Sequence, residues 1–334
     1  MKKILFASTA LVATAGVAAA EVTLTGMAEM GVYAGYENET QFFTDIDVTF
    51  TMSGEADNGL VFGANVDLDE SDGDPSGAFG PATQGGEAIF VSYGGLTLTM
   101  GDTDGALDAR VPELALAGGS LADDETSHLG FNHSDGISDL DDIEGTVGLS
   151  LDGFGDGQIA RVDYAISDFT ISASAEQIDD GNEVEDIGDT IWALGVSWNG
   201  ELAAIDMTAG LGYQTVSDAA SVTSVAVTGG FANGLSLGAT YSNMDIDGVD
   251  DDLQHYGVGF GYEMNALAIG VNWGQYDLGD DELSGWGVAA SYDLGGGLEA
   301  RFGYGWSDVD FTNADDESVS EDDNTWSLGL RMNF

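Results

Sequence analysis

The chain has 334 residues and carries 60 acidic side chains against 6 lysines and arginines, so its formal net charge at pH 7 is −54. This excludes nucleic acid as a partner, because almost no basic side chain is available to neutralise phosphates. The absence of cysteine excludes a disulfide framework, and 43% hydrophobic content is too high for a disordered acidic protein. Fifty glycines and three prolines are typical of many strands joined by tight turns.

The first twenty residues are typical of a secretory signal peptide. Two lysines are followed by a mostly apolar run from Ile4 to Val17, and three alanines precede Glu21. A basic start, an apolar centre too short to span a membrane and small residues before the cleavage point are the three parts of such a signal. We therefore predict export, with residues 1–20 removed and a single domain over 21–334.

After the signal peptide, apolar and polar residues alternate with a period of two, which is the side-chain period of a β-strand. The first such stretch starts at Val22 and the second at Phe42. The last nine residues, 326–334, repeat the pattern strictly, with large apolar side chains at every even position from Trp326 to Phe334. Outside the leader no run of eighteen apolar residues occurs, so we predict strands and no transmembrane helix.

Two kinds of connection alternate between these strands. One kind is short and mostly rich in glycine and asparagine, which supply the positive φ of tight hairpins. The seven short signals are Asn58-Gly59, Gly94-Gly95, Ser167-Asp168, Asn199-Gly200, Asn233-Gly234, Asn265-Ala266 and Gly295-Gly296-Gly297. The other eight connections are polar, mostly acidic and generally longer. Fifteen connections join sixteen strands, so we predict an all-β fold, a 16-stranded antiparallel transmembrane β-barrel.

A membrane barrel is favoured over a soluble β-sandwich, which would bury its apolar face against a second sheet. Aromatic residues gather near the ends of the predicted strands, where the two interfaces of a bilayer favour them. Sixteen strands leave an aqueous lumen. The predicted inward positions carry small or polar residues that we expect to face water. They include Thr240, Ser242, Gly257, Gly259, Gly261, Asn272, Gly303 and Gly305.

The longest connection, 102–157, is predicted to fold into the barrel and narrow its pore, because loops of this length are usually functional or disordered. An external loop like the others is the alternative. The insertion carries Arg110 and acidic residues that we expect at the constriction. These acidic residues are Asp104, Asp108, Glu113, Asp123, Asp124 and Glu125.

Strand alternation places the other three arginines of the mature chain inside the barrel. Arg161, Arg301 and Arg331 each alternate with apolar residues of the predicted outer face. An arginine facing lipid at the midplane would cost about 2–4 kcal/mol, so the lumenal side is favoured. A local salt bridge, such as Arg161 with Asp163 or Arg301 with Glu299, is an equal alternative that is compatible with a place in the pore.

Together these features resemble the general porins of Gram-negative outer membranes, most closely the alphaproteobacterial Rhodobacter type. The resemblance rests on the signal peptide, the sixteen strands, the oversized loop after the fifth strand and the terminal Phe334. It implies a homotrimer of water-filled pores that pass small hydrophilic solutes, with the third loop as the constriction. It also implies a basic wall opposite the acidic loop, which Arg161, Arg301 and Arg331 could form, and a place among the lipid and lipopolysaccharide of the outer membrane.

The predicted basic wall is thin, because carboxylates share its inward positions. These are Glu29, Asp45, Asp47, Asp67, Asp163 and Glu299. Rings of carboxylates favour cations, so we predict cation selectivity. Acidic loops such as 179–183, 245–252 and 315–317 also resemble fragments of calcium sites, although none has the full spacing of an EF-hand and solvated loop charge is the favoured interpretation. We expect no required cofactor, with Ca²⁺ in these loops as an option.

Other functions remain open. A substrate-specific channel would carry aromatic residues on the lumen side, where Tyr33 and Phe90 are the obvious ones. An exported calcium-dependent adhesin would share the acidity and the glycine content, but it should show nonapeptide repeats, and none is found. A barrel-embedded hydrolase would need a nucleophile beside a base, and no such motif accompanies His128, His133 or His255. We therefore expect no enzyme.

Overall fold

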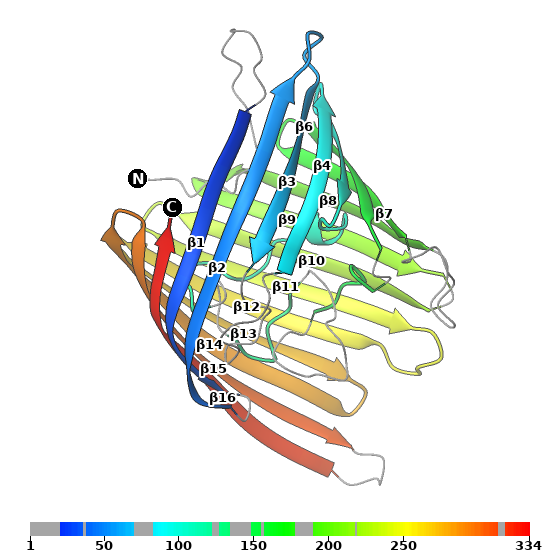
Figure 1. Ribbon diagram of the computed structural model, residues 1–334. Coiled ribbons are helices and arrows are strands. Elements are labelled where there is room, and N and C mark those ends of the chain that lie inside the picture. Colours follow the sequence, from blue (N-terminus) through cyan, green and yellow to red (C-terminus); the bar gives the residue numbers. More distant parts are fainter. Residues whose placement is uncertain are drawn as a thin grey trace.

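The structure is a computed structural model that describes residues 21–35, 38–69, 83–121, 127–133, 148–154, 157–177, 190–217, 219–312 and 318–334. Within these ranges sixteen antiparallel strands pair with their neighbours in sequence, and β16 pairs with β1, which closes the sheet into a barrel (Figure 1). This confirms the predicted fold class. The strands are β1 (Glu21–Gly35), β2 (Asn38–Glu55), β3 (Val61–Asp69), β4 (Thr83–Tyr93), β5 (Leu96–Gly101), β6 (Ile159–Ile166), β7 (Phe169–Gln177), β8 (Thr190–Leu202), β9 (Ile205–Val216), β10 (Ala220–Phe231), β11 (Leu235–Ile246), β12 (Leu253–Met264), β13 (Leu267–Leu278), β14 (Asp281–Gly295), β15 (Leu298–Thr312) and β16 (Ser318–Asn333).

The two ends of the described chain close the barrel. β1 and β16 lie side by side in Figure 1, in blue and red, and their register includes Ala34 opposite Trp326. Beyond the last strand, the backbone N–H of Phe334 donates to the carbonyl oxygen of Gly26 at 2.8 Å. Closure leaves β1 and β16 without the open edge at which an unclosed sheet would expose unpaired backbone groups. The predicted signal peptide, residues 1–20, lies outside the described residues.

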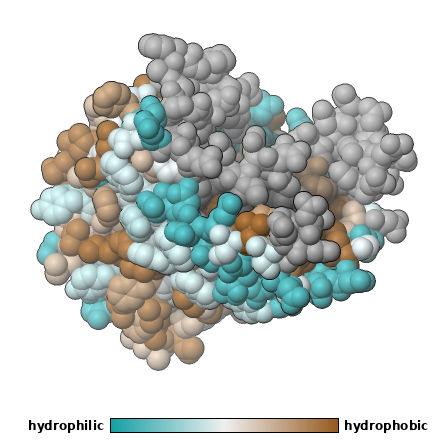
Figure 2. Space-filling view, turned by 90° about the horizontal axis from the view of Figure 1, so that it is seen from below, coloured by the Kyte–Doolittle hydropathy of each residue, from teal (hydrophilic) through white to brown (hydrophobic). Residues whose placement is uncertain are grey.

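Strand β8 shows how the two faces of the barrel differ. Trp192 and Leu194 are 59% and 61% exposed, whereas their neighbours Ile191 and Ala193 are 2% and 3% exposed. β16 also turns Leu328 outward, at 52%. In Figure 2 apolar brown side chains form much of the outline at the left and bottom, and hydrophilic teal side chains gather in the middle. An outward apolar face is stable in hydrocarbon and not in water, which is the surface of a membrane-spanning barrel.

Six of the seven predicted turns lie where the sequence signals place them, but the prediction at Asn199-Gly200 is wrong. Both residues lie inside β8, and the chain turns at Ala203 and Ala204, whose φ angles are 53° and 63°. The left-handed region costs a residue with a Cβ about 1–2 kcal/mol. Pairing between β8 and β9 continues to Leu202 opposite Ile205, so the extra ladder outweighs the local preference of Asn-Gly.

The connection between β5 and β6 is far longer than any other in the barrel. Its described parts contain a short 3₁₀ helix, η1 (Asp108–Arg110). Within the described ranges, no helix has the length and apolar content needed to cross a membrane. We refer to residues 102–158 as the inserted loop. Apart from residues 157–158, which lead into β6, its described segments are the outgoing segment (102–121), the return segment (127–133) and the closing segment (148–154).

Candidate functional site

The outgoing segment lies against the inner face of the barrel. Near its start, the N–H of Ala106 donates to Ser174 Oγ of β7 at 2.8 Å, and at its end the N–H of Leu121 donates to Ser327 Oγ of β16 at 3.1 Å. Both loop residues are almost fully buried, at 0% and 1% exposed. In Figure 1 the coloured parts of the loop cross in front of the far wall of the barrel. The outgoing segment therefore follows the wall from β7 to β16.

The return and closing segments follow the wall back. Ser127 accepts a hydrogen bond from Thr325 of β16 through its carbonyl oxygen, and the N–H of Leu129 donates to Ser307 Oγ of β15 at 2.9 Å. The N–H of Leu151 then donates to Gln214 Oε1 of β9 at 2.7 Å. Inward serine, threonine and glutamine side chains thus bind the backbone of the loop, which satisfies polar groups that are buried away from water.

An apolar cluster fills the space between the inserted loop and β8–β13. The loop contributes Leu107, Val111, Leu149 and Leu151, which pack against buried residues of the wall. The wall residues are Ile191, Val216, Val222, Ala226, Met244 and Tyr276. Burial of these side chains against the wall holds the loop there through the hydrophobic effect, in addition to its hydrogen bonds.

The expectation that small inward residues face water is wrong over much of the wall. A Cβ atom added to Gly257 or Gly259 would contact Leu114, and one added to Gly303 would contact Ser120. The inserted loop covers these positions. The same holds for Asn272, which is 7% exposed and lies 2.6 Å from His128, and for Gly261 and Gly305, which face Ala117 and Ser127. Ser242 is also buried, at 0% exposed. Strand alternation identifies which residues point inward, but not what covers them.

Asp152 joins the end of the loop to its start. Its Oδ2 accepts the N–H of Gly105 at 2.7 Å, and its Oδ1 accepts Nε2 of Gln214. Burial raises the pKa of Asp152 to about 6, against the hydrogen bonds from Gly105 and Gln214, which lower it, while the nearby Asp104 raises it further. The carboxylate is therefore ionised at neutral pH and can accept both hydrogen bonds.

Two histidines fasten the return segment to the wall. His128 Nε2 lies 2.6 Å from Asn272 Oδ1 of β13, and His255 Nε2 of β12 lies 3.1 Å from the carbonyl oxygen of Gly130. Burial lowers the pKa of His128 to about 4, so its ring is neutral at pH 7. Because Asn272 Oδ1 can only accept a hydrogen bond, the single ring proton of His128 lies on Nε2. Tyr276 adds a hydrogen bond from its hydroxyl to the carbonyl oxygen of Phe131 at 3.0 Å.

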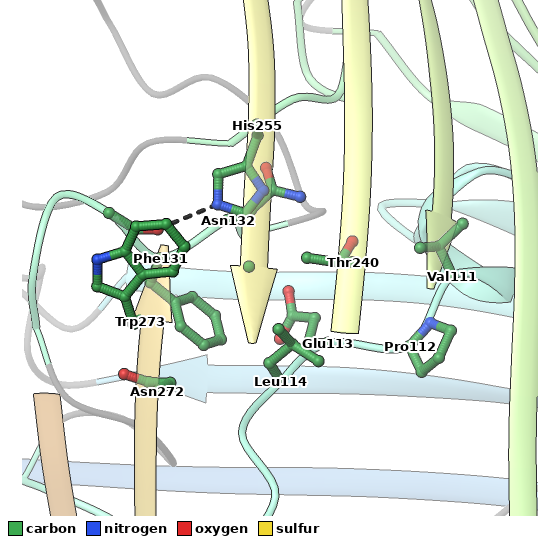
Figure 3. Close-up of a pocket in the computed structure, with 12 residues that line it drawn as sticks. Val111, Pro112, Glu113, Leu114, Phe131, Asn132, Thr240, His255, Asn272 and Trp273 are labelled. Carbon is green, nitrogen blue, oxygen red and sulfur yellow. Dashed lines mark hydrogen bonds between the residues drawn. The ribbon is translucent and has the colours of Figure 1, made fainter. Parts of the chain in front are cut away.

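A narrow pocket separates the return segment from the outgoing segment. Figure 3 shows Glu113 and Leu114 of the outgoing segment in this pocket, with His255 and Thr240 of the wall nearby; the dashed line marks the bond from His255 to Gly130. Glu113 is only half-buried. The sequence predicted Glu113 for the constriction but did not indicate that His255 lines the same pocket.

Two of the four predicted site arginines lie near the start of the loop. Arg161 of β6 is 3.5 Å from Asp104 Oδ2 and 3.1 Å from Asp163 Oδ2, and it also donates to the carbonyl oxygen of Asp104. Burial lowers the pKa of Arg110 in η1, although Asp163, Asp104 and Asp108 oppose this. The predicted local pair of Arg161 with Asp163 is therefore present. The side chain of Asp104 stays 59% exposed.

The other two arginines lie at the seam where β1 meets β16. Arg301 Nη1 and Arg331 Nη1 are 3.4 Å and 3.7 Å from the same oxygen, Oε1 of Glu29 on β1. Arg301 also donates to the carbonyl oxygen of Ser120 at 3.0 Å and lies 3.6 Å from Glu299. The side chain of Arg301 is only 9% exposed, and its contacts with Ser120 and Glu29 connect the loop to the seam.

The predicted site residues therefore fall into two groups. The structure brings Asp104, Asp108, Arg110 and Arg161 together, and it places Arg301 and Arg331 on Glu29 instead. Three predicted residues, Asp123, Asp124 and Glu125, lie outside the described residues. Sequence reasoning missed the residues that hold the loop, because an inward serine or amide has no distinctive spacing. They are Ser174, Gln214, Asn272, Ser307, Thr325 and Ser327.

Comparison with known proteins agrees with this architecture. A family model described as Gram-negative porin matches residues 7–312. A porin of Rhodobacter capsulatus is 27% identical over 321 residues, which cover 88% of this chain and 96% of the relative. Among solved structures, a variant of the porin of Rhodopseudomonas blastica matches with a TM-score of 0.66 at 16% identity, over 94% of this chain and 100% of that one. A triple variant of that porin gives 0.65 at 17%. The solved structures show a shared fold.

Proposed function

The chain belongs to the Gram-negative porin family, and we propose that its barrel is a water-filled channel through which small hydrophilic solutes and ions diffuse, with a preference for cations. The resemblance to Rhodobacter-type porins that the sequence predicted is confirmed. Family and fold point to a channel rather than to an enzyme. Selectivity, assembly and the residues of the constriction are the finer parts of the proposal.

The charges near the start of the inserted loop support the preference for cations. In the described wall, Arg161 is paired with carboxylates, and Arg301 and Arg331 share Glu29, so carboxylates offset the charge of each. The side chain of Asp104 is 59% exposed and leaves negative charge facing solvent. This exposed carboxylate is the main observation in support of cation preference. A ring of carboxylates lowers the energy of a cation in a pore and raises that of an anion.

We assign the narrowest part of the channel to the region around η1. Asp104, Asp108 and Arg110 of the loop and Arg161 of β6 would border it, with Glu113 further along the outgoing segment. Arg301 would act on the loop from behind, because it is buried beneath it, and Arg331 would act through Glu29, which it shares with Arg301. For Asp123, Asp124 and Glu125 a place at the constriction stays a prediction.

The test is the reversal potential of the purified protein in a planar bilayer with a gradient of potassium chloride. We expect the sign of a cation-selective pore. Asp104→Asn should lower the ratio of cation to anion permeability by about twofold, because a charge at the constriction acts directly on the ion. The matched control is Asp250→Asn, whose carboxylate is exposed in the connection between β11 and β12, and it should leave the ratio unchanged. An anion-selective reversal potential would overturn the preference, and an absence of conductance would overturn the channel.

We further propose a homotrimer in the outer membrane, in contact with its lipid and lipopolysaccharide. Apolar side chains on β1 and β2 support an apolar environment, since Val22, Leu24 and Phe42 are 66%, 63% and 86% exposed. The mass of the purified protein in mild detergent tests the assembly. A monomer under conditions that keep the barrel folded would contradict the trimer.

The predicted calcium sites are for the most part outside the described residues. Two of the three acidic loops, 179–183 and 315–317, lie outside the described residues. The third, 245–252, is described and is mostly exposed. In the described part of the chain, no three acidic or histidine side chains converge closely enough to hold a metal ion. We propose that divalent cations bridge the acidic loops between protomers or to lipid, and that chelation lowers the melting temperature of the trimer. An unchanged melting temperature would contradict this.

A further inference from the structure

The wall of the barrel meets the inserted loop through glycines. At six described positions, a Cβ added to a wall glycine would lie under 3.0 Å from a backbone carbonyl oxygen of the loop, a distance that real Cβ atoms essentially never show. We call these glycines the glycine track. The pairs are Gly195 with Ala106, Gly210 with Arg110, Gly259 with Leu114, Gly270 with Ala117, Gly274 with Gly130 and Gly305 with Ser127. The track extends over β8, β9, β12, β13 and β15.

Backbone conformation does not explain the glycines of the track. None has a positive φ, and each lies within a regular paired strand, where any residue can adopt the same angles. Glycine in a strand costs stability and typically marks a place where another backbone approaches closely. Close approach is what the structure shows here, so the space above each Cα is the property that these positions supply.

The wall matches both polar groups of the loop backbone. At the glycines, the carbonyl oxygens of the loop rest on Cα atoms, an arrangement that allows weak C–H···O hydrogen bonds. Between them, inward hydroxyl groups accept the loop N–H groups: Ala106 donates to Ser174, Leu121 to Ser327 and Leu129 to Ser307. The wall therefore contacts the loop backbone directly, in addition to the apolar loop side chains that pack against it.

We propose that the glycine track sets the bore of the channel by fixing how closely the inserted loop lies against the wall. This rests on the proposed function as a channel. The pore is the space between the loop and the opposite wall. Displacement of the loop away from the wall that it contacts therefore reduces the width of the pore. A methyl group on the track would move the loop by about 1 Å, since non-bonded atoms prefer separations of about 3.5–4.0 Å. The positioning residues then lie behind the loop and away from the solute.

Gly210→Ala and Gly270→Ala are the sharpest tests. At both positions the three atoms nearest to an added Cβ all belong to the loop: to Arg110 and Pro112 at Gly210, and to Ala117 at Gly270. The matched control is Gly230→Ala on β10, where the nearest atom, the carbonyl oxygen of Asp206, is 3.8 Å away. Folding of each variant is checked by circular dichroism and by the heat-dependent shift of the barrel in electrophoresis.

Single-channel conductance in a planar bilayer is the readout. We expect the conductance of each track variant to fall by about 1.5-fold or more, because the loop is displaced into the lumen. The size limit for permeating neutral sugars should also be lower than in the wild type. The control should match the wild type. If the glycines served stability alone, the folded variants would melt earlier but conduct normally. Wild-type conductance in both folded track variants would overturn the inference, while a wild-type protein without conductance would overturn the proposed channel as well.

A second pair of variants applies if an alanine prevents folding. Ser307→Ala and Ser327→Ala add no bulk and remove the acceptors of the N–H groups of Leu129 and Leu121. A loop that the wall positions should then fluctuate more, so we expect open-channel current noise to rise at least about twofold, since each lost tie leaves a buried N–H unsatisfied. Noise equal to the wild type in both variants would overturn the inference.

Discussion

The carboxylate of Asp152 accepts the backbone N–H of Gly105 at 2.7 Å, although the two residues are 47 positions apart in the chain. This contact closes the inserted loop on itself. Because Gln214 of β9 donates to the same carboxylate, the closure is also attached to the wall. The ordering of so long a segment costs conformational entropy, which this closure, the apolar cluster and the ties along the wall together offset.

The stability of the barrel should depend on pH through Asp152. Its pKa is raised from 3.8 to about 6, so between these values the folded state keeps a proton that the unfolded state has lost. The free energy of unfolding therefore falls by about 3 kcal/mol in total as pH rises from about 4 to 6. Above pH 6 this contribution no longer changes. Urea unfolding in detergent, compared with Asp152→Asn at each pH, isolates this contribution, because the asparagine does not titrate. A difference between the two proteins that stays constant from pH 3.5 to 7 would contradict the prediction.

His128 should act in the opposite direction over a similar range. Burial lowers its pKa from 6.5 to about 4, so as pH falls between these values only the unfolded state gains the proton. Stability is complete above pH 6.5 and decreases by about 3 kcal/mol on the way to pH 4. His128→Gln should remove this loss, as followed by urea unfolding or by proteolysis of the return segment. The control is His133→Gln, at a partly exposed position, which should keep the acid sensitivity.

Glu29 should be a strong determinant of stability at the seam. Its side chain is 1% exposed and lies within salt-bridge distance of both Arg301 and Arg331. Glu29→Gln leaves two arginines with less compensating charge, and breaking a buried pair typically costs about 3–5 kcal/mol. Glu299→Gln is the matched control, because Glu299 is 31% exposed and contacts only one of these arginines; its loss should cost about 0–1 kcal/mol. Equal unfolding midpoints for the two variants would refute the role of Glu29.

The turn between β8 and β9 should be improvable. Ala203 and Ala204 both have positive φ. Two-residue hairpins with positive φ at both central positions favour Asn-Gly there. The double change Ala203→Asn with Ala204→Gly should raise the unfolding free energy by about 1 kcal/mol through relief of backbone strain. Conversely, Asn265→Ala, at a φ of 56°, should lower it by a similar amount. No gain from the double change would mean that neighbouring contacts, and not φ, decide the stability of this turn.

Much of the fold could be predicted because its signals are local. The side chains of a strand alternate with a period of two, so each strand shows its inner and outer faces in a few consecutive residues, as in 326–334. Six of seven turns and the place of the long insertion follow from residues that are adjacent in the chain. The exception at Asn199-Gly200 arises where pairing with β9 competes with the local preference.

The candidate site was predictable only in part. Alternation placed Arg161, Arg301 and Arg331 inward, but it could not distinguish an arginine beside an exposed carboxylate from one buried beneath the loop, as Arg301 is. It also assigned water to inward glycines that in fact support a backbone.

The sequence by itself determined the number of strands, the closed barrel, its apolar exterior and the existence of an oversized loop. Only the tertiary structure decided what the inner wall is for, because the contacts that answer this join residues far apart in the chain: Leu121 and Ser327 are 206 positions apart, and Ser120 and Arg301 are 181. The direction of a side chain is set by the backbone on either side of it. What that side chain meets depends on how the whole sheet closes around the loop.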